Sequence, residues 1–347
     1  MKKITFLNDS TIPSIYQIIE SFTDYQFEIS NEFDFFEFFK SDSDVFVISA
    51  ASALIPNKTW KVLLEKYFLK TNKILIIGGA HDTLHDVENL IFRENFDMLF
   101  KTYQDRIKFL YVGVLESNLE KRLSKFKITC LSDYEHFNDS VLICPEIKTI
   151  DAERKNKFLL TTILKKMKHR QLLKIELEKE NLLKYHIGKI SEKKDYDNWD
   201  GLVTKNSIIR PDAFISWDLY NSSSFEIVPE TRGENFTYMT EKTIKPIMAK
   251  LPFLILSNKD YYSHLKQFGF KTFDSLIDES FAYEDNLETR VRKLVQTAKH
   301  ILDNGAIDFY NASQEICDHN KEHMFYFAKK QENMYYQNIY NFFNKLD

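Results

Sequence analysis

Short apolar runs recur along this chain, and each is followed by turn residues and then by an amphipathic stretch. In the first 145 residues the runs lie at 4–7, 45–49, 74–77, 109–112 and 141–144, with amphipathic stretches such as 12–22 and 58–68 between them. Continuous Val, Ile, Leu and Phe runs are typical of strands that are covered on both faces. Strands that alternate with helices predict an α/β fold with a parallel, doubly wound sheet.

The alternation is interrupted at residues 145–154 by a proline, an acidic pair and a run of charges, and it then resumes. We expect further strands at 158–162, 225–228 and 253–256, and helices at 168–184 and 240–249. Because 347 residues exceed the usual domain size of about 100–200 residues, the length predicts two domains with a cleft between them. We place two Rossmann-like domains at 1–150 and 151–318. A C-terminal helix at 319–347 is expected to pack back on the first domain.

Composition narrows the class of protein. The chain is 44% hydrophobic and 28% charged, which suits a folded globular protein, and its net charge of −4 argues against a general polyanion binder. The three cysteines Cys130, Cys144 and Cys317 match no zinc spacing and suit a reducing compartment. No apolar run has the length of a signal peptide or of a membrane span. We therefore expect a cytoplasmic protein with no membrane partner.

One segment of the second half carries the features of a phosphate-binding site. A strand at 225–228 is followed by Pro229 and Glu230, and a helix begins after Thr240, whose side chain can cap it. Glu230 and Thr240 are therefore candidates for contact with the ligand. Helix N-terminal N–H groups bind phosphate oxygens, and Lys242 and Lys245 can neutralise a pyrophosphate. Glu241 can accept hydrogen bonds from a ribose diol. The alternative is an ordinary capped helix with a charged first turn.

This segment resembles the donor-binding stretch of GT-B glycosyltransferases, especially the fucosyltransferase-like and exostosin-like families. Thr-Glu-Lys at 240–242 opens a helix that a Pro-hydrophobic strand follows. Gly-Phe-Lys-Thr-Phe at 269–273 and Asp-Glu-Ser at 278–280 are similar to a run in phage-encoded glycosyltransferase-like proteins. The match covers about residues 225–290. By this resemblance Glu241 holds the nucleotide ribose and Lys242 faces the phosphates.

A basic block precedes this segment in the chain. Residues 154–175 hold eight lysines and arginines and no acidic residue, and His169 and Arg170 match an element of the same phage group. That group usually has Asn and Arg where this chain has Thr161, Leu164 and Lys165. One interpretation is a solvated charged face. The other is that Arg170, whose planar guanidinium group can donate two parallel hydrogen bonds to a phosphate, binds the donor diphosphate.

The first half offers a catalytic base. The strand at 74–77 runs into Gly78 and Gly79, which allow a tight turn, and then into His81 and Asp82. A transferase that acts on a hydroxyl needs a base near that oxygen, and Asp82 is the first candidate and His81 the second. The placement is similar to a His-Asp pair in phage DNA hydroxymethylcytosine glycosyltransferases. The alternative is a glycine turn with Asp82 capping the next helix.

Signatures of several other chemistries are absent from the sequence. No dinucleotide-binding glycine fingerprint, Walker motif, nucleophile elbow or zinc-protease motif is present. Asp42 and Asp44 have the spacing of a metal-binding Asp-x-Asp pair but precede a strand rather than follow one. His319 and His323 have helical spacing, which favours a surface or packing role over a ligand pair. We therefore predict no metal and no cofactor.

Together these features predict a metal-independent glycosyltransferase with a nucleotide-sugar donor, expected to be UDP-linked, in the second domain and the acceptor on the first. One acceptor hypothesis is a 5-hydroxymethylated pyrimidine in phage DNA, with double-stranded DNA as a partner in the host cytoplasm. A saccharide or surface glycan is the second. A non-catalytic nucleotide- or protein-binding module of the same fold is the third. The sugar, the stereochemical course and the oligomeric state stay open.

Overall fold

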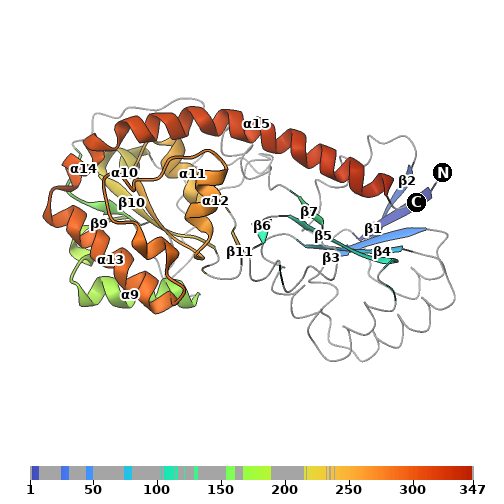
Figure 1. The fold of residues 1–347 in the computed structure, drawn as a ribbon, viewed down its shortest axis with the longest axis horizontal. Helices are drawn as coiled ribbons and strands as arrows, with labels where there is room; N and C mark the ends of the chain where they lie inside the picture. Colours follow the sequence, from blue (N-terminus) through green and yellow to red (C-terminus); the bar gives the residue numbers. More distant parts are fainter. Residues whose placement is uncertain are drawn as a thin grey trace. The chain divides into compact units, whose positions relative to one another are not determined.

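The computed structural model describes residues 2–7, 25–30, 44–49, 74–79, 103, 105–112, 114–115, 121, 129–131, 154–160, 167–188, 215, 217–231, 233, 236–237 and 239–345. Within them the protein is a mixed α/β structure with parallel sheets. Contacts between residues divide the chain into two compact units. The first unit comprises Met1–Val114, Asn118–Ser132 and Asn333–Asp347, and the second comprises Leu115–Ser117 and Asp133–Glu332. Figure 1 labels most of the helices and strands of both units.

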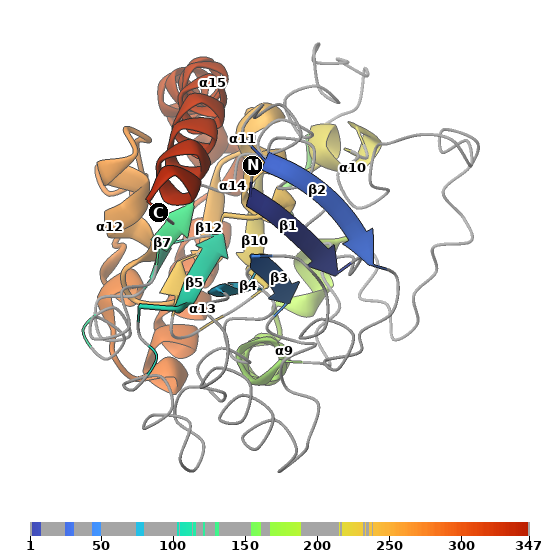
Figure 2. The ribbon, with the colours of Figure 1, turned by 90° about the vertical axis from the view of Figure 1, so that its right-hand side faces the viewer.

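The first unit contains a six-stranded parallel sheet with the order β2-β1-β3-β4-β5-β7. Its strands are β1 (Lys2–Leu7), β2 (Tyr25–Ser30), β3 (Val45–Ser49), β4 (Ile74–Gly79), β5 (Ile107–Val112) and β7 (Thr129–Leu131). Ile4, Val45 and Leu75 are completely buried, which explains why these strands are apolar runs. Figure 2 shows β2 beside β1 and a change of strand direction from β1 to β5, which is the usual twist of such a sheet.

Four of the five strands predicted in the first half are confirmed as β1, β3, β4 and β5. The expected strand at 141–144 and the amphipathic stretches at 12–22 and 58–68 lie outside the described residues. Strands β2 and β7 were not predicted from the sequence. In the sequence Tyr-Gln-Phe-Glu-Ile-Ser of β2, apolar and polar residues alternate, so it offers no continuous apolar run.

The second unit contains a four-stranded parallel sheet with the order β12-β10-β8-β9. These strands are β8 (Phe158–Leu159), β9 (His186–Ile187), β10 (Phe225–Pro229) and β12 (Phe253–Leu256). The strands predicted at 225–228 and 253–256 are confirmed, and the one at 158–162 is confirmed in its first two residues. Every residue of the central strand β10 and of the edge strand β12 is buried, as expected for strands covered on both faces. Two further short strands are β6 (Val114–Leu115) and β11 (Phe236–Thr237).

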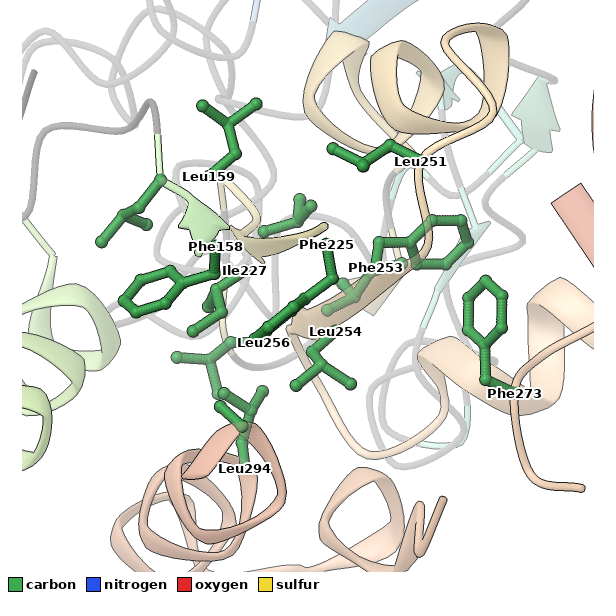
Figure 3. Close-up of a cluster of buried hydrophobic side chains, with 14 of the residues drawn as sticks. Phe158, Leu159, Phe225, Ile227, Leu251, Phe253, Leu254, Leu256, Phe273 and Leu294 are labelled. Atoms are coloured by element: carbon green, nitrogen blue, oxygen red, sulfur yellow. The ribbon is translucent and has the colours of Figure 1, made fainter. Parts of the chain in front are cut away.

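Helices cover both faces of the four-stranded sheet. They are α9 (Lys168–Lys179), α10 (Trp217–Ser222), α11 (Glu241–Met248), α12 (Tyr261–Gln267), α13 (Leu287–Asp303) and α14 (Ala306–Ala312), with the 3₁₀ turns η2 (Leu183–Tyr185) and η5 (Ser280–Tyr283). Helix α9 packs on α13, which contacts β12, whereas α11 packs on β10. Figure 3 shows Leu294 of α13 pointing at the strands from one side and Leu251, just after α11, on the other. The long helix α15 (Gln314–Asn344) ends the chain.

Phenylalanine side chains fill the core of the second unit. Phe158, Phe225, Phe253 and Phe273 are completely or almost completely buried, and Figure 3 shows them with the leucines of β12. The rings of Phe253 and Phe273 meet edge to face with 5.1 Å between their centroids. Edge-to-face contact adds about 0.5–1.5 kcal/mol to the energy of burial. The aromatic residues therefore help to join the loop at 270–273 to the sheet.

The two sheets share one feature of strand order. In each, the first strand of the sequence lies between the second and the third, so the order reverses between β1 and β3 and again between β8 and β10. Ligands of open parallel sheets bind at the carboxyl ends of the strands, where the order reverses. The arrangement of two Rossmann-like domains across a cleft, with boundaries near residues 150 and 318, stays a prediction.

Candidate functional site

Two segments of the second unit meet where its strand order reverses. His169 and Arg170 lie in the first turn of α9, which follows β8, and Glu230 directly follows β10. The Nε2 atom of His169 lies 2.8 Å from the Glu230 carbonyl oxygen, and an Arg170 guanidinium nitrogen donates to the same oxygen at 3.0 Å. A carbonyl oxygen can only accept, so Nε2 of His169 carries a proton. These two predicted residues are thus brought together with Glu230.

Gly233 allows this close packing. A Cβ atom at position 233 would lie 2.6 Å from Cγ of His169, closer than carbon atoms approach in folded proteins. His169 is almost completely buried beneath this glycine. The loop after β10 therefore needs a residue without a side chain at this position, and any larger residue would displace the imidazole.

The carboxylate of Glu230 is completely buried and accepts hydrogen bonds from five donors. Oε1 accepts from the Thr240 N–H at 3.2 Å, the Thr243 hydroxyl at 2.6 Å and the Tyr261 hydroxyl at 3.1 Å. Oε2 accepts from the Thr240 hydroxyl at 2.7 Å and the Thr231 N–H at 3.1 Å. A buried carboxylate is costly unless its oxygens are bonded in this way. Glu230 therefore binds protein groups rather than facing outward.

The predicted cap of α11 is confirmed. Thr240 has an extended backbone, and its hydroxyl accepts from the Lys242 N–H at 3.1 Å, so the helix begins at Glu241. The N–H of Thr240 itself is bound by Glu230. A carboxylate of the protein thus already lies at the start of this helix, the position that the sequence analysis assigned to a phosphate.

The charged side chains of the first turn of α11 interact with each other. Lys242 forms an ion pair with Glu241, and its Nζ lies 3.3 Å from the Thr231 hydroxyl. The Glu241 side chain is almost completely buried, whereas that of Lys242 is 22% exposed. Lys242 is therefore the more accessible of the two to a ligand. Lys245 lies almost one turn further along α11 and is partly buried.

Arg290, near the start of α13, was missed in the sequence and connects the same loops. Its guanidinium is buried and donates to the carbonyl oxygens of Gly233 at 3.1 Å and Ser257 at 2.6 Å. Its Nε donates to the Glu284 carbonyl oxygen at 2.9 Å. The residue thus joins the loop after β10 to the loop after β12. No local pattern marks it, because its partners lie far away in the sequence.

A second polar group at this edge was also missed. The side chains of Thr237 and Asn258 contact each other at 3.1 Å, and Nδ1 of His264 lies 2.6 Å from the Thr237 hydroxyl. Thr237 and Asn258 are buried. The position of Asn258, two residues after the buried strand β12, is a signal that could have identified this group.

Some side chains of the basic block at residues 154–175 make contacts within the fold. The Arg154 guanidinium stacks on the Tyr310 ring at 3.6 Å and donates to the carbonyl oxygens of Tyr220 and Ser223. Burial lowers the pKa of Arg154, and its contact with Tyr310 acts in the opposite direction. Lys174 pairs with Glu178 along α9. Lys165 and Lys166 lie outside the described residues.

The two histidines of α15 contact backbone. The Nε2 atoms of His319 and His323 lie 3.1 Å and 2.7 Å from the carbonyl oxygens of Gly269 and Phe268. Their rings stack with 5.8 Å between centroids. Among the described residues no group of three His, Cys, Asp or Glu side chains is arranged to hold a metal ion. In the same part of the chain, no helix has the length and apolar character needed to span a membrane.

His81 and Asp82, the candidates for the catalytic base, lie outside the described residues. A surface hollow of about 540 Å³ is present elsewhere in the second unit, lined by residues that include Lys266, Lys271 and Glu315. None of the predicted donor-site residues lines it, so we do not assign the donor to it. Arg170 and the segment at 240–242 lie instead against Glu230, at the reversal of strand order.

No known family model matches this chain, and no curated protein sequence is significantly similar to it. The assignment of a function therefore depends on the residues and the geometry described above.

Proposed function

We propose that the second unit binds a nucleotide-sugar donor at the carboxyl ends of β8 and β10, and that the chain is a glycosyltransferase of the GT-B type. One observation carries this proposal. Arg170 and the segment at 240–242 were selected from separate stretches of sequence, and both lie against Glu230 at the reversal of strand order. Parallel sheets bind nucleotides at this kind of position.

The donor diphosphate would lie between Arg170 and Lys242. Arg170 offers a planar fork for two phosphate oxygens, and Lys242 offers a partly exposed point charge. Both cations would stabilise the negative charge that develops on the leaving nucleotide. Glu241, already paired with Lys242, would accept hydrogen bonds from the ribose hydroxyls. His169 and Lys245 would support the site from α9 and from the second turn of α11.

The transfer step needs a base on the acceptor side. The acceptor hydroxyl oxygen would bond to the anomeric carbon of the sugar while the bond from that carbon to the phosphate oxygen breaks. The hydroxyl proton would pass to the carboxylate of Asp82, or to His81 as the second candidate. The nucleoside diphosphate would leave with the electron pair of the broken bond.

Nucleotide release from UDP-, GDP- and CMP-sugars tests the proposal. We expect sugar-dependent release from one donor, and Arg170→Ala and Lys242→Ala each to lower the rate at least about tenfold, because each removes a charge that contacts phosphate. Lys174→Ala is the matched control, since this lysine lies on the same helix as Arg170 but pairs with Glu178. Unchanged rates in both site variants would exclude the donor site. Nucleotide binding without release would indicate the non-catalytic module.

The acceptor is tested separately. We propose a 5-hydroxymethylated pyrimidine in duplex DNA, and the alternative is a saccharide. Phosphate contacts make DNA affinity fall steeply with salt, whereas saccharide binding is nearly independent of salt. A gel shift on modified and unmodified duplex at two salt concentrations distinguishes the two. Because Arg154 stacks on Tyr310, fewer cations of the basic block are available to DNA. The absence of salt-sensitive binding to the duplex would count against DNA and favour the saccharide.

A further inference from the structure

The Glu230 residue connects three elements of the second unit through two different groups. Its carbonyl oxygen is bound by His169 and Arg170 of α9. Its carboxylate is bound by Thr240, the cap of α11, and by Tyr261, the first residue of α12. The hydrogen bonds of Glu230 thus connect the start of α11 to the start of α9.

Two hydroxyl groups that bind the same oxygen of the carboxylate help to fix its orientation. Thr243 lies in the first turn of α11, and its hydroxyl is 2.7 Å from that of Tyr261. Both hydroxyls also reach Oε1 of Glu230. Burial, and then the nearby charge of Glu230, raise the pKa of the Tyr261 hydroxyl well above its usual value. Tyr261 therefore stays protonated and can act as a donor to this group.

The carboxylate leaves no room for a ligand. With five donors, both of its oxygens are saturated, and the side chain is completely buried. Glu230 was predicted from the sequence to be among the residues that touch the donor. Its contacts instead suit a residue that acts through its neighbours.

We propose that Glu230, Thr243 and Tyr261 are positioning residues that hold the first turn of α11, with Glu241 and Lys242, in the orientation that binds the donor. This inference rests on the proposed function for its ligand. The geometric part, that the three residues order the start of α11, can be measured without any ligand. Preorganised side chains bind more tightly because less ordering is needed on binding.

Two adjacent tyrosines provide a matched pair of variants. Tyr261 and Tyr262 are equally buried, but the Tyr262 hydroxyl accepts from the Ile255 N–H of β12 at 2.9 Å. Tyr261→Phe and Tyr262→Phe therefore remove the same atom from the same helix. Each loses a buried hydrogen bond, so both are expected to lower the melting temperature. Only Tyr261→Phe changes the Glu230 group.

Hydrogen exchange of the full-length protein tests the geometric part. We expect Tyr261→Phe to raise the exchange rates of the Thr240 and Lys242 amides about fivefold, because a buried hydrogen bond contributes about 1 kcal/mol to local order. Tyr262→Phe should raise exchange at Ile255 and leave the two α11 amides unchanged. Equal exchange at Thr240 and Lys242 in wild type and Tyr261→Phe would overturn the inference.

Nucleotide affinity tests the ligand part, using the nucleotide that the wild-type protein binds. We expect Tyr261→Phe to raise Kd about tenfold and Glu230→Gln to raise it further, since a Gln amide would face the N–H of Thr231 or Thr240. Tyr262→Phe should keep the wild-type Kd. Unchanged Kd in Tyr261→Phe and Glu230→Gln would overturn the inference and leave the proposed function standing. If the wild type binds none of the nucleotides, the proposed function fails and the ligand part fails with it.

Discussion

At each end of the four-stranded sheet, an arginine side chain donates hydrogen bonds to backbone carbonyl oxygens. At the amino end, Arg154 precedes β8 and donates to the carbonyl oxygens of Tyr220 and Ser223. At the carboxyl end, Arg290 donates to the carbonyl oxygens of Gly233 and Ser257. Arg154 thus satisfies carbonyl groups at the end of helix α10, and Arg290 satisfies carbonyl groups in the loops after β10 and β12.

What differs is the neighbourhood of each arginine. Arg154 stacks on an aromatic ring, and nearby Asn156 binds the Leu302 carbonyl oxygen and the Ala306 N–H. The carboxyl end adds a buried carboxylate, Glu230, with Arg170 bound to its backbone. The two ends show that an arginine bonded to backbone carbonyl oxygens is not special to the proposed donor site. What sets the carboxyl end apart is a group of charged side chains that several loops bring together.

Arg290 provides the severest test of this comparison. We expect Arg290→Ala to lower the free energy of unfolding by about 4 kcal/mol, because it leaves several buried carbonyl oxygens without donors. Arg290→Lys should cause an intermediate loss in the free energy of unfolding, since an ammonium keeps the charge but lacks the several N–H donors of a planar guanidinium group. Urea denaturation followed by circular dichroism measures both. A loss below about 1 kcal/mol in Arg290→Ala would mean that the loops do not depend on this residue.

Glu279 sharpens the comparison, because it is a buried carboxyl group outside the Glu230 cluster. Its Oε1 accepts from the Phe273 N–H at 2.7 Å, and burial raises its pKa from 4.5 to about 7. The folded state then holds a proton that the unfolded state has lost between these pH values. The contribution of Glu279 to stability is therefore greatest below pH 4.5 and decreases as the pH rises through about 7.

The rise in the pKa of Glu279 corresponds to about 3 kcal/mol of stability across that range. Glu279→Gln cannot titrate, so its free energy of unfolding should vary less with pH than that of the wild type. Urea denaturation of both proteins at pH 5 and pH 8 measures the difference. The same pH dependence in both proteins would contradict the assignment to Glu279.

Arg154 tests the amino end alone. We expect Arg154→Ala to lower the free energy of unfolding by about 2 kcal/mol, because it removes a cation–π contact and hydrogen bonds to two carbonyl oxygens. Nucleotide affinity, measured by calorimetry on the folded protein, should stay at the wild-type value. A weaker affinity in Arg154→Ala would contradict the difference between the two ends, since it would connect the amino end to the proposed donor site.

Two glycines allow the smallest test, with one at each end. Gly305 has a φ of +100°, and a Cβ there would lie 2.6 Å from Oδ2 of Asp308, beside the residues that Asn156 binds. A Cβ at Gly233 would instead meet the His169 ring. Each alanine variant should cost about 1 kcal/mol in stability. Only Gly233→Ala should raise the Kd for nucleotide, and equal affinities in the two variants would contradict the role of the carboxyl end.

Much of the fold could be predicted because strands and caps leave local signals. The apolar runs at β3, β10 and β12 and the Thr240 cap depend on neighbours within a few residues. Strand β9 has two half-buried residues, so no apolar run marks it. In the site, Arg170 and Lys242 could be selected by charge and position. Arg290 could not, because its partner Gly233 lies 57 residues away.

Glu230 shows the limit most clearly. The sequence alone determined that a carboxylate follows a buried strand and that Thr240 caps the next helix, since both depend on local chain geometry. Only the tertiary structure decided that the carboxylate is buried and turned toward Thr243 and Tyr261. The reason is physical: burial and hydrogen-bond partners come from segments 13 and 31 residues away, and their approach is set by packing rather than by local pattern.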